Sequence, residues 1–226
     1  CIFIFFLFSI SSQTLGTLTF EHQLNTFVDN NDISLNNTNL MISRLRFGEE
    51  GKLSKLETIS NLTLVDFLGS DWSNETISLT PYRFVYSHEY QLTEVRAGLQ
   101  QLSFGTARYL RPLQWFDAIN ALDTDALNDG VYALLYRQYS LSNQVFWVWT
   151  LYDNNTLRIA DINSTVDNGL ELGARIQQPF SIGELGLSAH SRPISMSSSQ
   201  AQEYKFGVDF VANGLIPFWT EHMLSA

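Results

Sequence analysis

The sequence predicts an all-β protein built as an antiparallel, up-and-down sheet. Apolar and polar residues alternate along many short segments, which is the two-residue period of a half-buried strand. Clusters of Asn, Asp, Gly and Ser separate these segments at hairpin spacing, and little of the chain has helical periodicity. We therefore expect about eleven strands joined mainly by short turns.

The clearest strand is GLELGARIQQPF, residues 169–180. One of its faces is apolar, with Leu170, Leu172, Ala174 and Ile176. The other is polar or small, with Glu171, Gly173, Arg175 and Gln177. Periodicity alone does not say which face meets water, because a soluble sandwich buries its apolar face and an outer-membrane barrel turns it toward lipid.

Three hairpins are expected around this strand. A short turn after Tyr90 joins PYRFVYSHEY to TEVRAGLQ, and the segment SLSN joins GVYALLYRQY to QVFWVWTLY. The turn PFSIG leads into GELGLSAHSR, which places Glu184, His190 and Arg192 on the same face as Arg175.

The segment from Phe104 to Gly130 departs from strand periodicity. Pro112 suits the first position of a helix, and four apolar residues follow at helical spacing: Leu113, Phe116, Ile119 and Leu122. We expect a short helix over Pro112–Leu122 within a long loop that either caps a barrel or folds into its lumen.

Composition excludes several classes of function. The net charge of −10 offers no basic stripe for a nucleic acid. The one cysteine allows no internal disulfide, the four histidines are scattered singly, and no motif for catalysis, phosphate or dinucleotide binding occurs. We expect no enzyme activity, no metal and no cofactor.

An apolar run from Ile2 to Ile10 precedes the small polar residues SSQ. This pattern is typical of the hydrophobic and cleavage regions of an export signal, and nine residues are too few to span a bilayer as a helix, which needs about 20. We interpret residues 1–13 as a partial signal peptide and residues 14–226 as the N-terminal part of a barrel. A buried strand or part of a transmembrane helix are the other interpretations of the run.

The polar faces of the strands favour a membrane barrel. They carry Arg, Glu, Gly, Gln and Ser but little Lys, and glycine there lets strands curve. Aromatic residues gather toward several strand ends, as in the girdles of outer-membrane barrels. Trp147 and Trp149 share a face and would promote aggregation on a soluble surface, so we expect them to be buried or in lipid.

Residues 95–154 add a resemblance. They contain R-x-G-x-Q-x-x-x-F-G followed by L-R-P and F-D, carried by Arg96, Gly98, Gln100, Phe104, Gly105, Leu110, Arg111, Pro112, Phe116 and Asp117. This pattern resembles a porin-like family of outer-membrane β-barrel proteins of Gram-negative bacteria, over most of residues 76–222. The resemblance implies a transmembrane barrel that is larger than this chain, so the barrel is expected to be incomplete here.

Seven charged residues are the candidate substrate-binding residues: Arg96, Arg108, Arg111, Asp117, Glu171, Arg175 and Arg192. They would place basic and acidic groups around an inward loop at residues 105–130, forming a constriction for solutes. The alternative is that the same ion pairs only anchor the loop to the wall. Neutralising Arg108 and Arg111 would change ion selectivity only in the first case.

We expect a channel of the bacterial outer membrane that passes small polar or charged solutes. Its partners would be outer-membrane lipid and the solutes, with no nucleic acid, and a homo-oligomer is left open. Two alternatives remain: a secreted soluble β-sandwich or barrel that binds or cleaves glycans, and a plugged barrel with a structural role.

Overall fold

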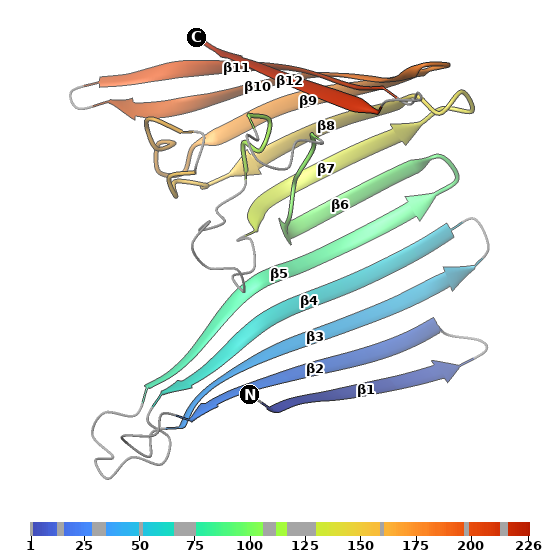
Figure 1. The fold of residues 1–226 in the computed structure, drawn as a ribbon, viewed down its shortest axis with the longest axis vertical. Coiled ribbons are helices and arrows are strands. Elements are labelled where there is room, and N and C mark those ends of the chain that lie inside the picture. The colour runs from blue at the N-terminus through green and yellow to red at the C-terminus, as the bar shows by residue number, and fades with distance from the viewer. Residues whose placement is uncertain are drawn as a thin grey trace. The chain divides into compact units, whose positions relative to one another are not determined.

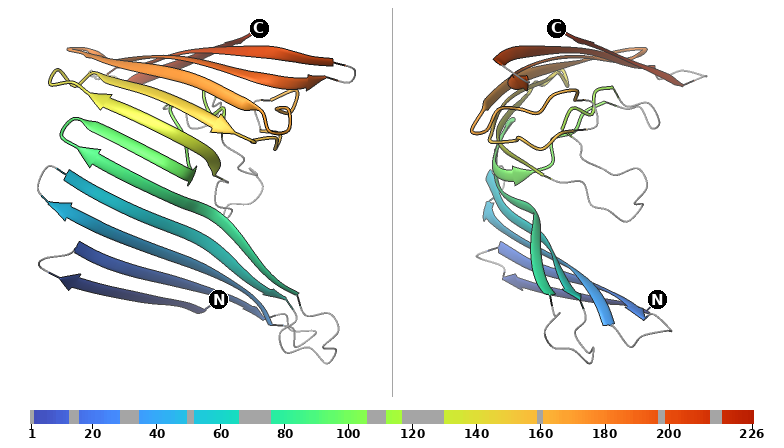
Figure 2. Two further views of the ribbon diagram at one scale, coloured as in Figure 1. Left: turned by 180° about the vertical axis from the view of Figure 1, so that it is seen from behind. Right: turned by 90° about the vertical axis from the view of Figure 1, so that its left-hand side faces the viewer.

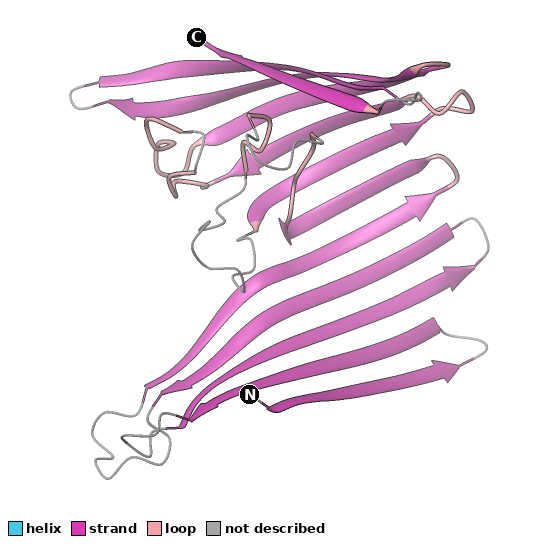
Figure 3. Cartoon of the chain, viewed as in Figure 1, coloured by secondary structure: helices cyan, strands magenta, loops and turns pink. Residues whose placement is uncertain are grey.

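The computed structural model describes residues 2–12, 16–28, 35–49, 52–65, 76–105, 112–116, 130–158, 161–196, 199–212 and 217–226. These residues form strands, turns and loops and contain no helix (Figure 3). The all-β prediction is therefore confirmed for this part of the chain. Within it, no helix is long and apolar enough to cross a membrane.

The chain divides into two compact units, residues 1–87 and residues 88–226. The first unit contains four strands that each pair antiparallel with the next: β1 (Ile2–Ser12), β2 (Gly16–Val28), β3 (Leu35–Glu49) and β4 (Lys52–Val65). Strand β5 (Thr76–Tyr90) runs from the first unit into the second (Figure 1).

Residues of the expected export signal form strand β1 and pair with β2. Phenylalanine and isoleucine dominate this segment and have high strand propensity, which agrees with the alternative of a strand. The export signal itself stays a prediction.

The second unit is an antiparallel meander in which every strand pairs with the next one in the chain. Its strands are β6 (Thr93–Gln100), β7 (Val131–Tyr139), β8 (Val145–Tyr152), β9 (Leu170–Phe180), β10 (Gly183–Met196), β11 (Ser199–Ala212) and β12 (Phe218–Ser225). The expected turns at residues 91–92, 140–144 and 181–182 are confirmed. Gln91 and Asn143 have φ angles of 50° and 61°, a left-handed conformation that tight turns use.

The short helix expected over Pro112–Leu122 is not supported. Residues 112–116 form turns, and the rest of that range lies outside the described residues. The reason lies in burial, since Leu113, Trp115 and Phe116 are all nearly inaccessible to solvent. Leu113 and Trp115 would point to opposite sides of a helix, so only a non-helical backbone can bury all three against one sheet.

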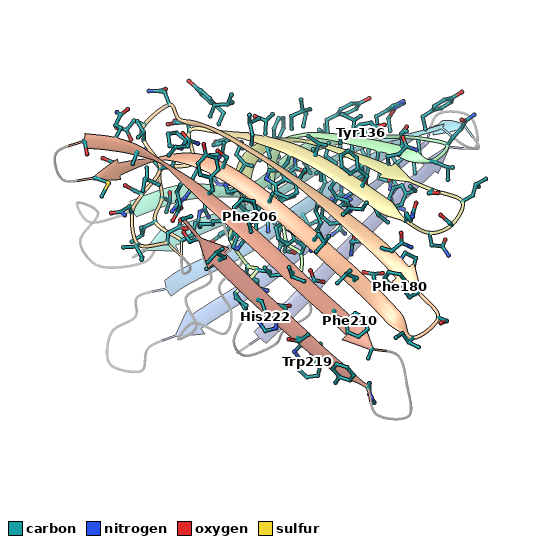
Figure 4. All side chains as sticks on the ribbon, turned by 90° about the horizontal axis from the view of Figure 1, so that it is seen from above. Tyr136, Phe180, Phe206, Phe210, Trp219 and His222 are labelled. Atoms are coloured by element: carbon teal, nitrogen blue, oxygen red, sulfur yellow. The ribbon has the colours of Figure 1, made fainter. Side chains whose placement is uncertain are left out.

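Alternation along the strands of the second unit separates two faces. The face that we call outer exposes large apolar side chains, with Leu170, Leu172 and Ile176 on β9 each more than two-fifths exposed. Tyr136, Phe180 and Phe206 are further aromatic residues exposed in this unit (Figure 4). The face that we call inner carries the polar positions, where Glu171 and Arg175 are only 3% and 2% exposed. The expected division of residues 170–177 between two faces is confirmed, and the apolar face is the exposed one.

The described parts of two loops cover the inner face: residues 102–105 and 112–116 of one, which we call the loop of residues 102–116, and residues 153–158 and 161–168 of the other, which we call the loop of residues 153–168. Figure 2 shows both on the same side of the second unit's strands. Trp149 is buried there, and Trp147 packs against the same cluster while remaining partly exposed. The tryptophan pair therefore faces the loops rather than the exposed apolar face, which on β8 carries Phe146, Val148 and Tyr152.

Candidate functional site

The inner face of the second unit carries a cluster of buried charged and polar residues. Its strand members occupy alternate positions of β9, β10 and β11: Glu171, Arg175, Ser188, His190, Arg192, Lys205 and Asp209. Each of them is 5% exposed or less. Charged groups this deeply buried must be paired, because their transfer out of water is otherwise too costly. We call this set the ion-pair cluster.

Arg175 on β9 is the centre of the first set of contacts. It donates hydrogen bonds to Asp209 Oδ2 at 2.6 Å and Asp209 Oδ1 at 2.9 Å, and a third to Ser188 Oγ at 2.8 Å. The paired donation matches the fork of a guanidinium to the two oxygens of a carboxylate, which is the strongest geometry for such a pair. Both side chains are almost inaccessible to solvent, so each charge is balanced by the other rather than by water.

His190 on β10 is held from both sides of its ring. Its Nε2 lies 2.9 Å from Glu171 Oε2, and Trp149 Nε1 donates to its Nδ1 at 3.3 Å. A ring that accepts at Nδ1 carries its proton on Nε2, so the neutral imidazole donates to Glu171. Thr165 Oγ1 completes the set by donating to Glu171 Oε1 at 2.9 Å.

Asp161 joins the loop of residues 153–168 to the sheet. Arg192 Nη1 donates to Asp161 Oδ2 at 2.7 Å, and Lys205 Nζ pairs with Asp161 Oδ1. Arg192 also donates to the main-chain oxygen of Asn163 at 3.0 Å and pairs with Glu203. Two cations on β10 and β11 therefore converge on one carboxylate of the loop, which fixes the loop against the inner face.

A second group of charges lies on β6 and β7, and we call it the arginine patch. Glu94 accepts from Arg96 Nε at 2.5 Å and from Arg137 Nη1 at 3.2 Å. Tyr139 also donates to Glu94, at 3.2 Å. The guanidinium carbon of Arg137 lies 3.8 Å from the ring centroid of Trp147 on β8, a cation–π contact.

Aromatic side chains join the loop of residues 102–116 to the same face. Phe104 lies against Trp149 with ring centroids 5.4 Å apart, and Phe116 lies 5.1 Å from His190. Trp115 Nε1 donates to Met223 Sδ on β12 at 3.1 Å. Because the loop follows β6 and reaches β12, it crosses the inner face and packs there as a small apolar core.

Four of the seven predicted site residues lie in the described part of the chain. Glu171, Arg175 and Arg192 belong to the ion-pair cluster, and Arg96 belongs to the arginine patch. The remaining three, Arg108, Arg111 and Asp117, lie outside the described residues. The structure thus joins Glu171 and Arg192 through Thr165, whose hydroxyl contacts both, whereas Arg96 lies in the separate patch.

Sequence reasoning missed several members of both groups. Lys205 and Asp209 could have been found, because YKFGVDF places both on the polar face of its strand. Asp161 and Arg137 gave no such signal, since the first lies in an Asn-rich loop and the second in a mostly apolar strand.

The arrangement provides fixed charges of both signs on one face. In the described part of the chain, no three His, Cys, Asp or Glu side chains are grouped so that they could hold a metal ion. No protein-family model, curated protein or solved structure matches this chain. We therefore infer a function from the physical properties of the two faces.

Proposed function

We propose that this chain is part of an outer-membrane β-barrel channel of a Gram-negative bacterium, one that passes small polar or charged solutes. The observation that carries this proposal is the division of faces in the second unit. Its exposed face is apolar, and its buried face holds the ion pairs. A soluble sandwich would bury the apolar face, whereas a membrane barrel covers it with lipid and turns the polar face inward.

The lengths of strands β9, β10 and β11 support the proposal. Strand β9 has 11 residues, while β10 and β11 have 14 each. At about 3.3 Å per residue, 11 residues extend about 36 Å, which projects to about 26 Å at a tilt of 45°. That span matches the apolar band of outer-membrane barrels, about 25 Å tall.

In this proposal the ion-pair cluster and the arginine patch line the inner wall, and the loop at about residues 105–130 narrows the passage. Charges fixed on a wall set the electric field that a solute meets and so determine which ions pass. The described part of the loop packs against the wall through Phe104 and Trp115, which suits a fixed constriction rather than a mobile lid.

A plugged barrel with a structural role is the second candidate. It is favoured by the packing of the loop of residues 102–116, because its side chains Leu113 and Trp115 are almost completely buried. A plugged barrel would insert into membranes as a channel does, but it would not conduct ions.

Membrane fractionation and planar-bilayer recording test the proposal together. We expect the full-length protein that contains this chain, produced in a Gram-negative host, to remain in outer-membrane fractions after carbonate washing and to migrate differently on gels with and without boiling. Purified protein should then give discrete conductance steps. A freely soluble monomer would contradict the membrane assignment, and insertion without conductance would favour the plugged barrel.

A further inference from the structure

Two buried N–H groups on neighbouring strands have no acceptor in the described part of the chain. They are Nε of Arg137 on β7 and Nε1 of Trp147 on β8. The two residues are direct cross-strand partners, and the guanidinium lies over the indole ring. Leaving a buried donor without a partner is unfavourable, so an acceptor that reaches these two neighbouring donors would be stabilised there.

The charges around these donors are unequal. Among the residues that the structure describes, Arg96 and Arg137 share the single carboxylate of Glu94, so one positive charge remains in this group. The side chains of Arg96 and Arg137 are 32% and 15% exposed, while that of Glu94 is 5% exposed. The accessible part of the arginine patch is therefore basic. Glu89 is a further acidic side chain, on β5, and it makes an interaction of its own.

Arg175 shows what a closed arginine site looks like on the same face. Its Nε also has no partner, but the rest of its guanidinium is occupied by Asp209 and Ser188, and its side chain is only 1% exposed. Arg175 pairs with the one carboxylate of Asp209, so this pair has no net charge. The arginine patch differs because it is accessible and has more cations than anions.

The donors of the patch specify the chemistry of the ligand. Guanidinium groups and an indole N–H donate hydrogen bonds and accept none, so the ligand must supply acceptor oxygens. One ring face of Trp147 is covered by Arg137, and the hydrogen bond that this indole still lacks is the one from its N–H. A carboxylate fits this set because its two oxygens match the planar fork of a guanidinium.

We propose that Arg96, Arg137 and the indole N–H of Trp147 form a binding site for the carboxylate group of a small anionic solute. This inference rests on the proposed function, since it is the channel that brings solutes to the inner face. Carboxylates would then be the class of solutes that this site on the inner face binds.

Calorimetric titration of the full chain in detergent with malonate tests the site. Replacing Arg137 by Gln removes a charge-assisted donor, so we expect malonate affinity to fall by about tenfold or more. Trp147→Phe keeps the aromatic packing and removes only the N–H, and we expect a loss of about threefold to tenfold in malonate affinity.

Arg44→Gln is the matched control. Arg44 also pairs with a carboxylate, that of Glu57, but it belongs to the first unit. Its malonate affinity should equal that of the original protein.

The outcomes distinguish specific malonate binding at the arginine patch from non-specific binding and from no binding. Weaker binding in both Arg137→Gln and Trp147→Phe, with unchanged binding in Arg44→Gln, supports the site. Absent malonate binding, or equal losses in Arg137→Gln and Arg44→Gln, overturns it. Circular dichroism of each variant must match the original, and Trp147→Phe alone decides if Arg137→Gln fails to fold. Bilayer conductance is recorded in parallel, so a channel without malonate binding and malonate binding without a channel are distinct results.

Discussion

Arg175 on β9 holds both carboxylate oxygens of Asp209 on β11, across the intervening strand β10. The pair meets above Gly186, the residue of β10 that is the register partner of Asp209. A Cβ atom at Gly186 would lie 2.3 Å from Arg175 Nη2 and 2.4 Å from Asp209 Oδ2. The absent side chain is what lets one ion pair connect three strands.

Replacing Asp209 by Ala should strongly destabilise the second unit. The substitution leaves the guanidinium of Arg175 buried without its counter-charge, and breaking a buried pair in this way costs about 3–5 kcal/mol. Urea unfolding in detergent, followed by tryptophan fluorescence, measures the free energy of unfolding. Glu57→Gln is the control, because its partner Arg44 has a side chain that is 38% exposed, and exposed pairs contribute about 0–1 kcal/mol. Equal effects of the two substitutions would contradict the structural role of Arg175 and Asp209.

Gly186→Ala should destabilise the same unit without removing any charge. The added methyl group occupies the space of the Arg175 and Asp209 side-chain atoms, so one of them must move out of its hydrogen-bond geometry. We expect a loss of about 1–3 kcal/mol, the usual cost of overpacking. The same urea titration measures it. Ser191→Ala, at a partly exposed position of the same strand, should change the free energy of unfolding by less than about 0.5 kcal/mol.

The strands and the two faces of the second unit could be predicted from sequence, because strand alternation is a local pattern. Residues 170–177 of GLELGARIQQPF already alternate between apolar positions and polar or small ones, and no distant contact is needed to see this pattern. The hairpin turns were predictable for the same reason, since turn residues lie between two such patterns.

The partners of the charged residues could not be predicted, because they depend on register and on loop placement. Asp161 pairs with Arg192 and Lys205, residues 31 and 44 positions away, only because its loop folds over the inner face. The helix prediction failed at Pro112–Phe116 for a related reason. Helical spacing is a local signal, and burial of Trp115 against a distant part of the sheet overrides it.

Trp115→Ala should loosen the loop of residues 102–116 from the inner face. Trp115 is 2% exposed and contacts Phe104, Phe116 and Met223, so its removal leaves a cavity beneath the loop. We expect a loss of about 3–5 kcal/mol in the free energy of unfolding, typical of a buried Trp→Ala change. Limited proteolysis should cut the variant faster within residues 102–130.

The same variant separates the constriction from the plug. If the loop narrows an open channel, its release should raise the single-channel conductance of Trp115→Ala, and if it plugs the barrel, conductance should appear only in the variant. Gln114→Ala changes the neighbouring, partly exposed residue and should leave both proteolysis and conductance unchanged. Identical conductance of Trp115→Ala and the original protein would exclude both roles.

Ile176→Arg distinguishes a lipid-covered outer face from a water-covered one. Ile176 is 43% exposed near the middle of β9, between its register partners Phe146 and Leu187. In water, an arginine at an exposed strand position should change stability by less than about 0.5 kcal/mol. In a bilayer, the same charge near the midplane should cost about 2–4 kcal/mol. We therefore expect Ile176→Arg to reduce both folding into lipid vesicles and the free energy of unfolding measured there.

Phe180→Arg is the depth control for this prediction. Phe180 is 52% exposed on the same strand but ends it, beside the turn at residues 181–182, where a charge can reach the headgroups. Its cost in vesicles should be about 0–1 kcal/mol, because the penalty for arginine falls toward the interface. A gradient between positions 176 and 180 requires a hydrocarbon layer against this face, since water imposes no dependence on position along the strand. Equal and small effects at the two positions would therefore reject the membrane assignment.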